Sequence, residues 1–337
     1  MASASRLYLF MSQRHYKTLG TIATVTLVLC LWASALLMPT PIQQEPLRVA
    51  VGMWPGAEPW ILAREAGEIN PSRVNLVEMN WTSAAMRAVG NGVVDAAVLS
   101  LDEVIRQIHQ GYPLKIVMVT DISRGADLLM ANPTLTSIQD LKGRRIGYEP
   151  RTSGAWLLSK ALKNATLKLA DVQQVPLNPG EVEEIYEELN LDGVVLSEPW
   201  RQRLNGLNLK NLYDSSSPNS FIVRVLAVHS DAITEHRESL ISILRAHFKW
   251  MPKLQHEDII SDSILRREGI SNEVFQNILS HLEMVNLERN QALLSQREPW
   301  LGKLFQDLQI DLVEDTTSGA PLNPSDVFDA ELLEELP

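Results

Sequence analysis

Short runs of β-branched and apolar residues alternate with helix-start signals along most of this 337-residue chain. The first run, 47–52, predicts a strand, and Glu58-Pro59-Trp60 then opens a helix, because proline suits the first helical turn and an acid suits a helix N-terminus. The alternation continues to about residue 231, and the pattern beyond it is mainly helical. Further strands are predicted at 74–79, 96–99, 114–120, 145–148, 172–175, 194–196 and 221–228. Repeated strand–helix–strand units are typical of an α/β fold, in which a mostly parallel sheet is covered by helices.

Two segments in different halves of this pattern resemble each other. Asp95-Ala-Ala-Val-Leu-Ser100 and Asp192-Gly-Val-Val-Leu-Ser197 share Asp, Val, Leu and Ser at equivalent positions. Each predicts a buried strand that ends in a hydroxyl group, and in open α/β sheets ligands bind beyond the carboxyl ends of the strands. Two such sheets facing each other would form a cleft lined by both sets of strand ends. Chance similarity between two ordinary buried strands is the alternative.

Residues 19–38 form an uncharged, mostly apolar run that is long enough to cross a bilayer. Three basic residues precede this run and the next charge after it is Glu45, so the positive-inside rule places the N-terminus in the cytoplasm. Small residues at 33–35 would also suit signal-peptide cleavage. Residues 1–45 are therefore predicted to be a cytoplasmic stub, a membrane segment and a linker, with the membrane segment either retained as an inner-membrane anchor or cleaved. Both alternatives place the rest of the chain in the periplasm or another extracytoplasmic space.

Composition excludes several classes of function. The chain carries 30 Lys and Arg against 41 Asp and Glu, a net charge of −11, whereas nucleic-acid binding needs a basic surface. The single cysteine, Cys30, excludes a disulfide framework and a CxxC metal site. It follows Leu29, where lipid attachment requires a small residue, so we expect an apolar thiol in a membrane helix. No GxSxG, HExxH, Walker A or GxGxxG motif is present, and the histidines lack metal-ligand spacing, so we expect no cofactor, no metal and no catalysis.

Five segments carry a resemblance to a known family. They are Met53-Trp-Pro-Gly-Ala-Glu-Pro59, Asp95-Ala-Ala-Val98, Asp121-Ile-Ser-Arg-Gly-Ala-Asp127, Ile138-Gln-Asp-Leu-Lys-Gly-Arg-Arg-Ile-Gly147 and Ser197-Glu-Pro-Trp200. Over residues 46–255 the chain resembles the periplasmic substrate-binding proteins of the nitrate/sulfonate/bicarbonate type, within the larger group that contains thiamine-precursor-binding proteins.

This resemblance implies a type II periplasmic-binding-protein fold with two lobes, each a mostly parallel sheet flanked by helices. Lobe one would comprise 46–124 and 221–320, and lobe two would comprise 125–220. The two chain crossings between the lobes imply ligand capture by hinge closure.

Nine residues are predicted to contact a ligand, and several have a purely structural alternative. Trp54 could form a flat wall of the ligand pocket or pack on its own lobe. Glu58 could bind an amine of the ligand or only interact with the dipole of its helix. Ser100 begins a capping box, which already explains it, and Asp127 could pair with Arg124 instead. Ser153-Gly154 opens a helix with free N–H groups, or is a plain N-cap. The full prediction is Trp54, Gly56, Glu58, Ser100, Ser123, Asp127, Ser153, Gly154 and Glu198.

The charges near the predicted cleft indicate the kind of ligand. Glu58, Asp127 and Glu198 outnumber Arg124 and Arg151 there. Because a buried carboxylate facing an anion is strongly unfavourable, we expect a ligand with hydrogen-bond donors, such as a nitrogen heterocycle or an amine.

The favoured function is therefore a small-molecule receptor for an ABC importer whose permease and ATPase are separate chains. A membrane-tethered sensor input that signals to a membrane partner is an alternative. A thiamine-pyrimidine type of enzyme is disfavoured, because such enzymes use a Cys-rich segment and the only cysteine here lies in the membrane run. The acidic segment 321–337 is expected to be solvated or loosely docked, with an amphipathic helix through Phe328, Leu332 and Leu336 as the alternative.

Overall fold

The computed structural model describes residues 24–34, 44–204, 206–255, 262–312 and 320–337. These residues belong to two units, 1–45 and 46–337. In the first unit residues 24–34 form a helix, and both ends of the predicted span 19–38 lie outside the described residues. Among the described helices, none combines the length and the apolar character that crossing a bilayer requires. Export or anchoring by this segment therefore stays a prediction.

The first sheet of residues 46–337 has six strands in the order β11-β4-β10-β3-β1-β2. Three of them, β1, β2 and β3, are parallel, whereas β10 runs antiparallel to β3 and β4, and β11 runs antiparallel to β4. The strands are β1 (Leu47–Val51), β2 (Val74–Glu78), β3 (Ala96–Ser100), β4 (Leu114–Ser123), β10 (Ile222–His229) and β11 (Leu282–Met284).

The second sheet has five strands in the order β7-β6-β8-β5-β9. The strands β6, β7 and β8 are parallel, and β5 runs antiparallel to β8 and β9. Their bounds are β5 (Asp127–Ala131), β6 (Arg145–Tyr148), β7 (Gln173–Pro176), β8 (Gly193–Ser197) and β9 (Lys210–Asp214). Each sheet thus joins a parallel part, which the alternation predicted, to antiparallel strands. The strands β4, β5, β9 and β10 flank the two passages of the chain between the sheets, whereas the antiparallel strand β11 lies at the edge of the first sheet.

The two segments that resemble each other form equivalent strands, β3 and β8. Each pairs with the middle strand of its parallel part, β1 or β6. The Asp95 carboxylate accepts the backbone N–H of Arg48 at 2.8 Å, and the Asp192 carboxylate accepts that of Arg145 at 2.9 Å. Because the strand position and the aspartate contact both recur, the predicted internal repeat is confirmed.

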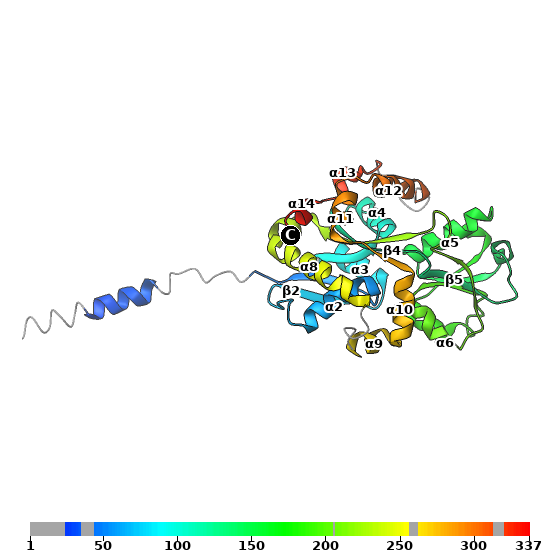
Figure 1. Ribbon diagram of the computed structural model, residues 1–337, viewed down its shortest axis with the longest axis horizontal. Coiled ribbons are helices and arrows are strands. Elements are labelled where there is room, and N and C mark those ends of the chain that lie inside the picture. The colour runs from blue at the N-terminus through cyan, green and yellow to red at the C-terminus, as the bar shows by residue number, and fades with distance from the viewer. Residues whose placement is uncertain (1–23, 35–43, 205, 256–261, 313–319) are drawn as a thin grey trace, which may run out of the picture. The chain divides into compact units, whose positions relative to one another are not determined.

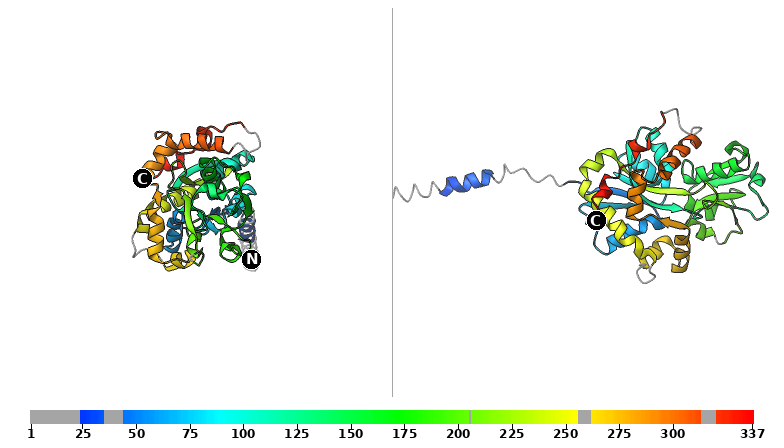
Figure 2. Two further views of the ribbon diagram at one scale, coloured as in Figure 1. Left: turned by 90° about the vertical axis from the view of Figure 1, so that its right-hand side faces the viewer. Right: turned by 45° about the horizontal axis from the view of Figure 1, so that its top comes forward.

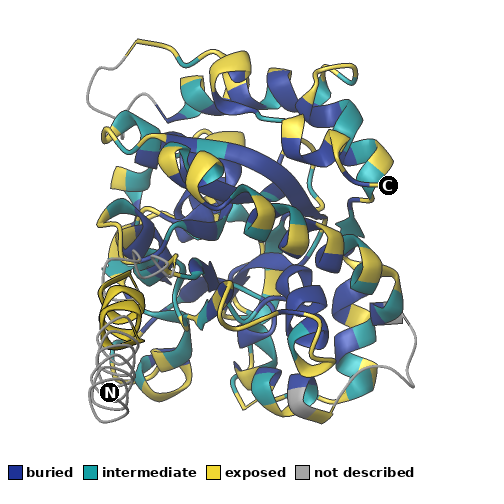
Figure 3. Cartoon of the chain, turned by 90° about the vertical axis from the view of Figure 1, so that its left-hand side faces the viewer, coloured by how far each residue is buried: buried dark blue, intermediate teal, exposed yellow. Residues whose placement is uncertain are grey.

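Helices pack against both sheets (Figure 1). The residues that the helices bury belong to the same hydrophobic clusters as the buried residues of the strands (Figure 3). Figure 1 shows α5 and α6 beside β5 in one group of elements, and α2, α3, α4 and α8 in the other. The lobe boundaries themselves stay a prediction. The helices are α2 (Glu58–Glu65), α3 (Thr82–Gly90), α4 (Leu101–His109), α5 (Ser153–Asn164), α6 (Val182–Ile185), α7 (Ser230–Glu235), α8 (Arg237–Trp250), α9 (Asp262–Glu268), α10 (Asn272–Ser280), α11 (Leu287–Leu294), α12 (Trp300–Asp311), α13 (Pro324–Val327) and α14 (Glu331–Glu334).

The C-terminal segment is docked, so the expectation of a solvated or loose tail is wrong for residues 321–337. Leu332 is fully buried and Phe328 is nearly so, with its ring 5.4 Å from that of Phe305. The N–H of Asp329 donates to the carbonyl of Ile116 on β4 at 2.9 Å. Apolar burial against the first sheet outweighs the repulsion among the acids, which remain at the surface. Both views of Figure 2 show this red segment lying against the fold.

Candidate functional site

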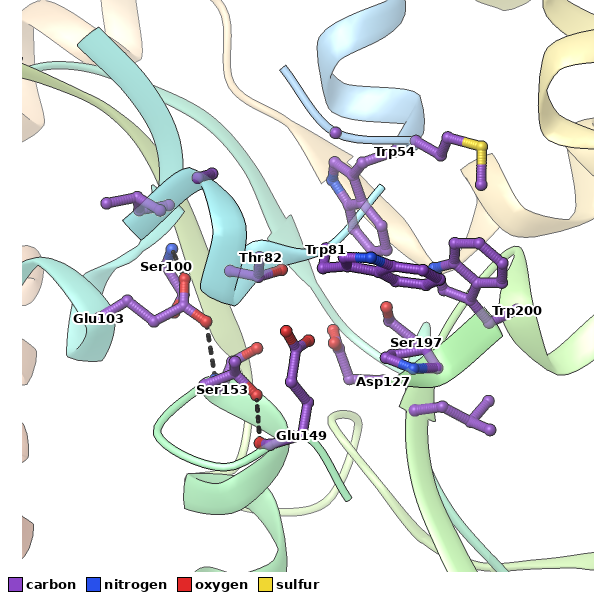
Figure 4. Close-up of a pocket in the computed structure, with 18 of the residues that line it drawn as sticks. Trp54, Trp81, Thr82, Ser100, Glu103, Asp127, Glu149, Ser153, Ser197 and Trp200 are labelled. Atoms are coloured by element: carbon purple, nitrogen blue, oxygen red, sulfur yellow. Dashed lines mark hydrogen bonds between the residues drawn. The ribbon is translucent and has the colours of Figure 1, made fainter. Parts of the chain in front are cut away.

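A cavity of about 90 Å³ lies between the two sheets, at the carboxyl ends of their parallel strands (Figure 4). On the first sheet its walls are the loop after β1, the start of α3 and the end of β3. On the second sheet they are the first residue of β5, the loop after β6, the start of α5 and the end of β8. This position follows the general rule for ligand sites in open α/β sheets.

Five of the nine predicted ligand residues line this cavity: Trp54, Ser100, Asp127, Ser153 and Gly154. Ser100 also serves its alternative role, because its N–H donates to Glu103 Oε2 at 2.8 Å in the predicted capping box. Its hydroxyl donates to Asp102 Oδ1 at 2.6 Å. The other four predicted residues, Gly56, Glu58, Ser123 and Glu198, lie outside this lining.

Gly56 makes room for a buried carboxylate beside the cavity. A Cβ atom on Gly56 would lie 2.0 Å from Oδ2 of Asp121. The same oxygen accepts the indole N–H of Trp54 at 3.0 Å. Burial raises the pKa of Asp121, and the nearby Arg224 opposes this rise. Gly56 therefore acts on the site through Asp121 and Trp54.

Arg224 lies against Trp54 and holds Asp127. Its guanidinium carbon is 3.5 Å from the centroid of the Trp54 ring, so this part of the predicted aromatic wall is already covered. It donates to both oxygens of Asp127, at 2.7 and 3.1 Å. Burial opposes the charge of Arg224, but Asp127 and Asp121 raise its pKa above the ordinary value. The structural alternative for Asp127, a pair with Arg124, is wrong, because Arg124 instead bonds Glu283.

Glu58 and Glu198 are held by arginines outside the cavity. Glu58 is fully buried and pairs with Arg267, which lies on α9 far along the chain. Glu198 accepts from Nε of Arg201 at 2.5 Å, and burial raises its pKa against this partner. Because each carboxylate is already bonded to a cation of the chain, neither is placed to meet a ligand here.

Ser123 joins the two chain crossings. Its hydroxyl lies 2.8 Å from that of Ser215, on the return crossing. The Ser215 hydroxyl also accepts the backbone N–H of Gly125 at 2.7 Å and that of Asp127 at 3.3 Å. Ser123 is fully buried in this junction and does not reach the cavity.

Two glutamates that were not predicted connect the lobes across the cavity. Glu103 on α4 accepts the backbone N–H of Ser153, at the start of α5, at 2.8 Å. Glu149, in the loop after β6, accepts the backbone N–H of Ser83, in the first turn of α3, at 2.9 Å. Each carboxylate thus satisfies a free N–H at a helix N-terminus on the opposite sheet. Burial, together with the neighbouring Asp102, raises the pKa of Glu103 to about 7.

Two tryptophans also meet across the cavity. Trp81, just before α3, stacks on Trp200 with ring centroids 5.4 Å apart. Gly180 allows this contact, because a Cβ there would lie 2.4 Å from the Trp81 ring. Glu149 and Trp81 both lie just beyond strand ends, so the strand-end rule could have found them. Glu103 was not predicted as a site residue, because its place in the capping box already accounted for it.

The cavity therefore combines aromatic walls with an excess of carboxylates. Glu103, Asp127 and Glu149 line it, against one cation, Arg224. Arg151, predicted near the cleft, lines a separate cavity of about 520 Å³ that shares Glu149. Within the described residues, no group of three or more His, Cys, Asp or Glu side chains is arranged to hold a metal ion.

Known proteins share this sequence pattern and fold. A "Putative binding protein" of Brucella abortus (strain 2308) is 29% identical over 130 residues, which are 35% of this chain and 40% of the relative. The match thus spans well under half of that relative's length. A "Putative aliphatic sulfonates-binding protein" of Escherichia coli (strain K12) is 24% identical over 229 residues, 60% of this chain and 72% of the relative.

The fold likeness is wider than the sequence likeness. The ligand-binding component of an ABC-type import system from Staphylococcus aureus superposes with a TM-score of 0.70 at 13% identity, covering 87% of this chain and 99% of that one. The expected α/β periplasmic-binding-protein fold and the resemblance to substrate-binding proteins are both confirmed. A model described as the NMT1-like family matches residues 40–258, so the chain belongs to the NMT1-like family.

Proposed function

We propose that this chain captures a small organic molecule between its two lobes and delivers it to an ABC importer whose permease and ATPase are separate chains. The observation that carries the proposal is the cavity walled by both sheets, with Glu103 and Glu149 each bonded to the opposite side. Contacts of this kind form when two lobes meet around a ligand and break when they part. The E. coli relative, named for binding aliphatic sulfonates, supports the class of function and leaves the ligand open.

The proposed hinge lies at the two chain crossings, one between β4 and β5 and the other between β9 and β10, which Ser215 joins. The Ser215 hydroxyl bonds to groups on the other crossing, so it links the segments that must bend together. The docked C-terminal segment weakens the alternative of a sensor, because this acidic segment packs on the chain's own fold and is not free to contact a signalling partner.

We further propose that the chain binds its ligand without converting it. The fold alone does not separate binding from catalysis, since one fold serves many functions. Support comes from the sequence, whose only cysteine lies at position 30, outside the cavity lining. Incubation of the purified chain with a bound metabolite, followed by mass spectrometry, should return the metabolite unchanged; a converted product would refute this part.

Export is also part of the proposal. Residues 19–38 are uncharged and follow three basic residues, which supports either an inner-membrane anchor or a cleaved signal. Fractionation of cells with N-terminal sequencing of the mature chain distinguishes the two. A chain recovered intact from the cytosol would contradict both.

A thermal-shift screen against a metabolite library tests the binding function. A ligand at a hundredfold excess over its Kd should raise the unfolding free energy by about 2.7 kcal/mol. Trp81→Leu should abolish or reduce the shift, because Trp81 lines the cavity. Trp250→Leu removes an indole whose N–H bonds Glu68 outside the cavity, so this matched control should keep the shift. Equal loss in both variants, or no shift with any metabolite, would count against the proposal.

A further inference from the structure

The charged groups of the cavity are unevenly matched. Its one cation, Arg224, donates to both oxygens of Asp127 and also approaches Asp121 at 4.0 Å. Within the described part of the chain, neither Glu103 nor Glu149 forms an ion pair with a lysine or arginine. Two nearly buried carboxylates therefore face the cavity without a cation of their own.

These two carboxylates also occupy the positions that an anion would take. The N–H groups at a helix N-terminus are the usual place for a bound anion. At α5 the N–H of Ser153 is bonded to Glu103 at 2.8 Å, and at α3 the N–H of Ser83 is bonded to Glu149 at 2.9 Å. An anionic ligand would have to displace a tethered carboxylate and then lie beside it, which costs several kcal/mol of unpaired buried charge.

The remaining groups suit a cation. In Figure 4 the side-chain oxygens of Glu149, Asp127 and Ser197 lie in the same space, next to the ring of Trp81. Carboxylate and hydroxyl oxygens accept hydrogen bonds from an ammonium group, and an indole face attracts positive charge. A cation placed there would gain both contacts without displacing Glu149 from α3.

The size of the cavity limits the ligand. About 90 Å³ corresponds to about three water molecules at their liquid share of about 30 Å³ each, which is space for a few non-hydrogen atoms. We propose that the cavity selects a small organic ammonium ion, whose N–H groups donate to Glu149 and whose charge lies against Trp81. This inference rests on the proposed solute-binding function and specifies its ligand class.

A series of three probes isolates the charge. Butylammonium, butan-1-ol and butanesulfonate share one alkyl chain and carry charges of +1, 0 and −1 at neutral pH. Binding of each to the purified full chain is followed by tryptophan fluorescence at pH 7.5 and constant ionic strength. We expect butylammonium to bind at least tenfold more tightly than either of the other two. Equal affinities, tighter binding of butanesulfonate, or no binding by butylammonium would overturn the inference.

A matched pair of variants tests the assigned carboxylate. Glu149→Gln keeps an oxygen that can accept the N–H of Ser83 and removes the charge, so butylammonium should lose at least tenfold in affinity. Glu187→Gln removes an exposed carboxylate that lies between α6 and β8 and does not line the cavity, so it should leave the affinity unchanged. Unchanged binding in Glu149→Gln would refute the role of Glu149, and the wild-type probe series does not depend on either variant folding.

The two proposals fail in different ways. If butanesulfonate or another anion binds tightly and closes the lobes, the ammonium assignment is refuted and the solute-binding function stands. If no metabolite in the thermal-shift library binds, the solute-binding function itself is refuted.

Discussion

The carboxyl group of Glu103 should make the stability of this protein fall as the pH rises from about 4.5 to about 7. Burial and the neighbouring Asp102 raise the pKa of Glu103 from 4.5 to about 7, so the folded state holds a proton that the unfolded chain releases. The stability contributed by the protonated form is complete below the unfolded pKa and is lost as the pH rises through the folded one. At about 1.36 kcal/mol for each unit of pKa, the loss from this group amounts to about 3 kcal/mol.

Glu103→Gln removes this titration and keeps one acceptor oxygen, so one of the two N–H groups of Ser100 and Ser153 loses its partner, a cost that does not change with pH. The assay is denaturant unfolding of the wild type and the variant at pH values from 4.5 to 8. Because Glu268, whose pKa burial also raises to about 7, titrates in both proteins, its effect cancels in the difference. The variant should gain about 3 kcal/mol relative to the wild type between the two ends of the range. A difference that stays constant with pH would refute the reasoning.

Three further predictions follow from single contacts. Gly56→Ala places a Cβ against the Asp121 carboxylate, and overpacking of this kind should cost about 1–3 kcal/mol in denaturant unfolding; an unchanged midpoint would contradict the close approach. Leu332→Ala should cost about 2–5 kcal/mol if the C-terminal segment is docked, and a solvated tail would show almost no loss. Ser215→Ala leaves the N–H of Gly125 without its acceptor and should speed amide exchange there, whereas unchanged exchange would argue against the junction.

Local sequence signals predicted the parallel parts of both sheets well. The alternation located β1, β3, β6 and β8, and the capping box at Ser100 marked the start of α4. Three antiparallel strands were not predicted, namely β5, β9 and the three-residue β11. The five residues of β5 are all buried, so they show no alternation, and the burial pattern of β9 has none either. Short strands of this kind depend on their neighbours in the sheet for identification.

The site was predicted in part, because strand ends are visible in a sequence and ion pairs between distant residues are not. Trp54 and Ser100 lie where the strand-end rule placed them, and Asp127, taken from the segment 121–127 that carries the resemblance, also lines the cavity. Glu58 looked available to a ligand, yet its partner Arg267 lies some two hundred residues later in the chain. The resemblance predicted the right family and fold, while the contacts that Glu103 and Glu149 make with the opposite sheet emerged only from the three-dimensional arrangement.

The most direct test of the central claim measures the distance between the lobes with and without a ligand. Spin labels at Arg87 and Glu181, on a Cys30→Ser background, report this distance, because the two exposed residues line opposite sides of the same 520 Å³ cavity beside the ligand cavity. With the strongest ligand from the thermal-shift screen, we expect the distance distribution to shorten and narrow. A distribution that is identical in the empty and the saturated protein would contradict capture by lobe closure.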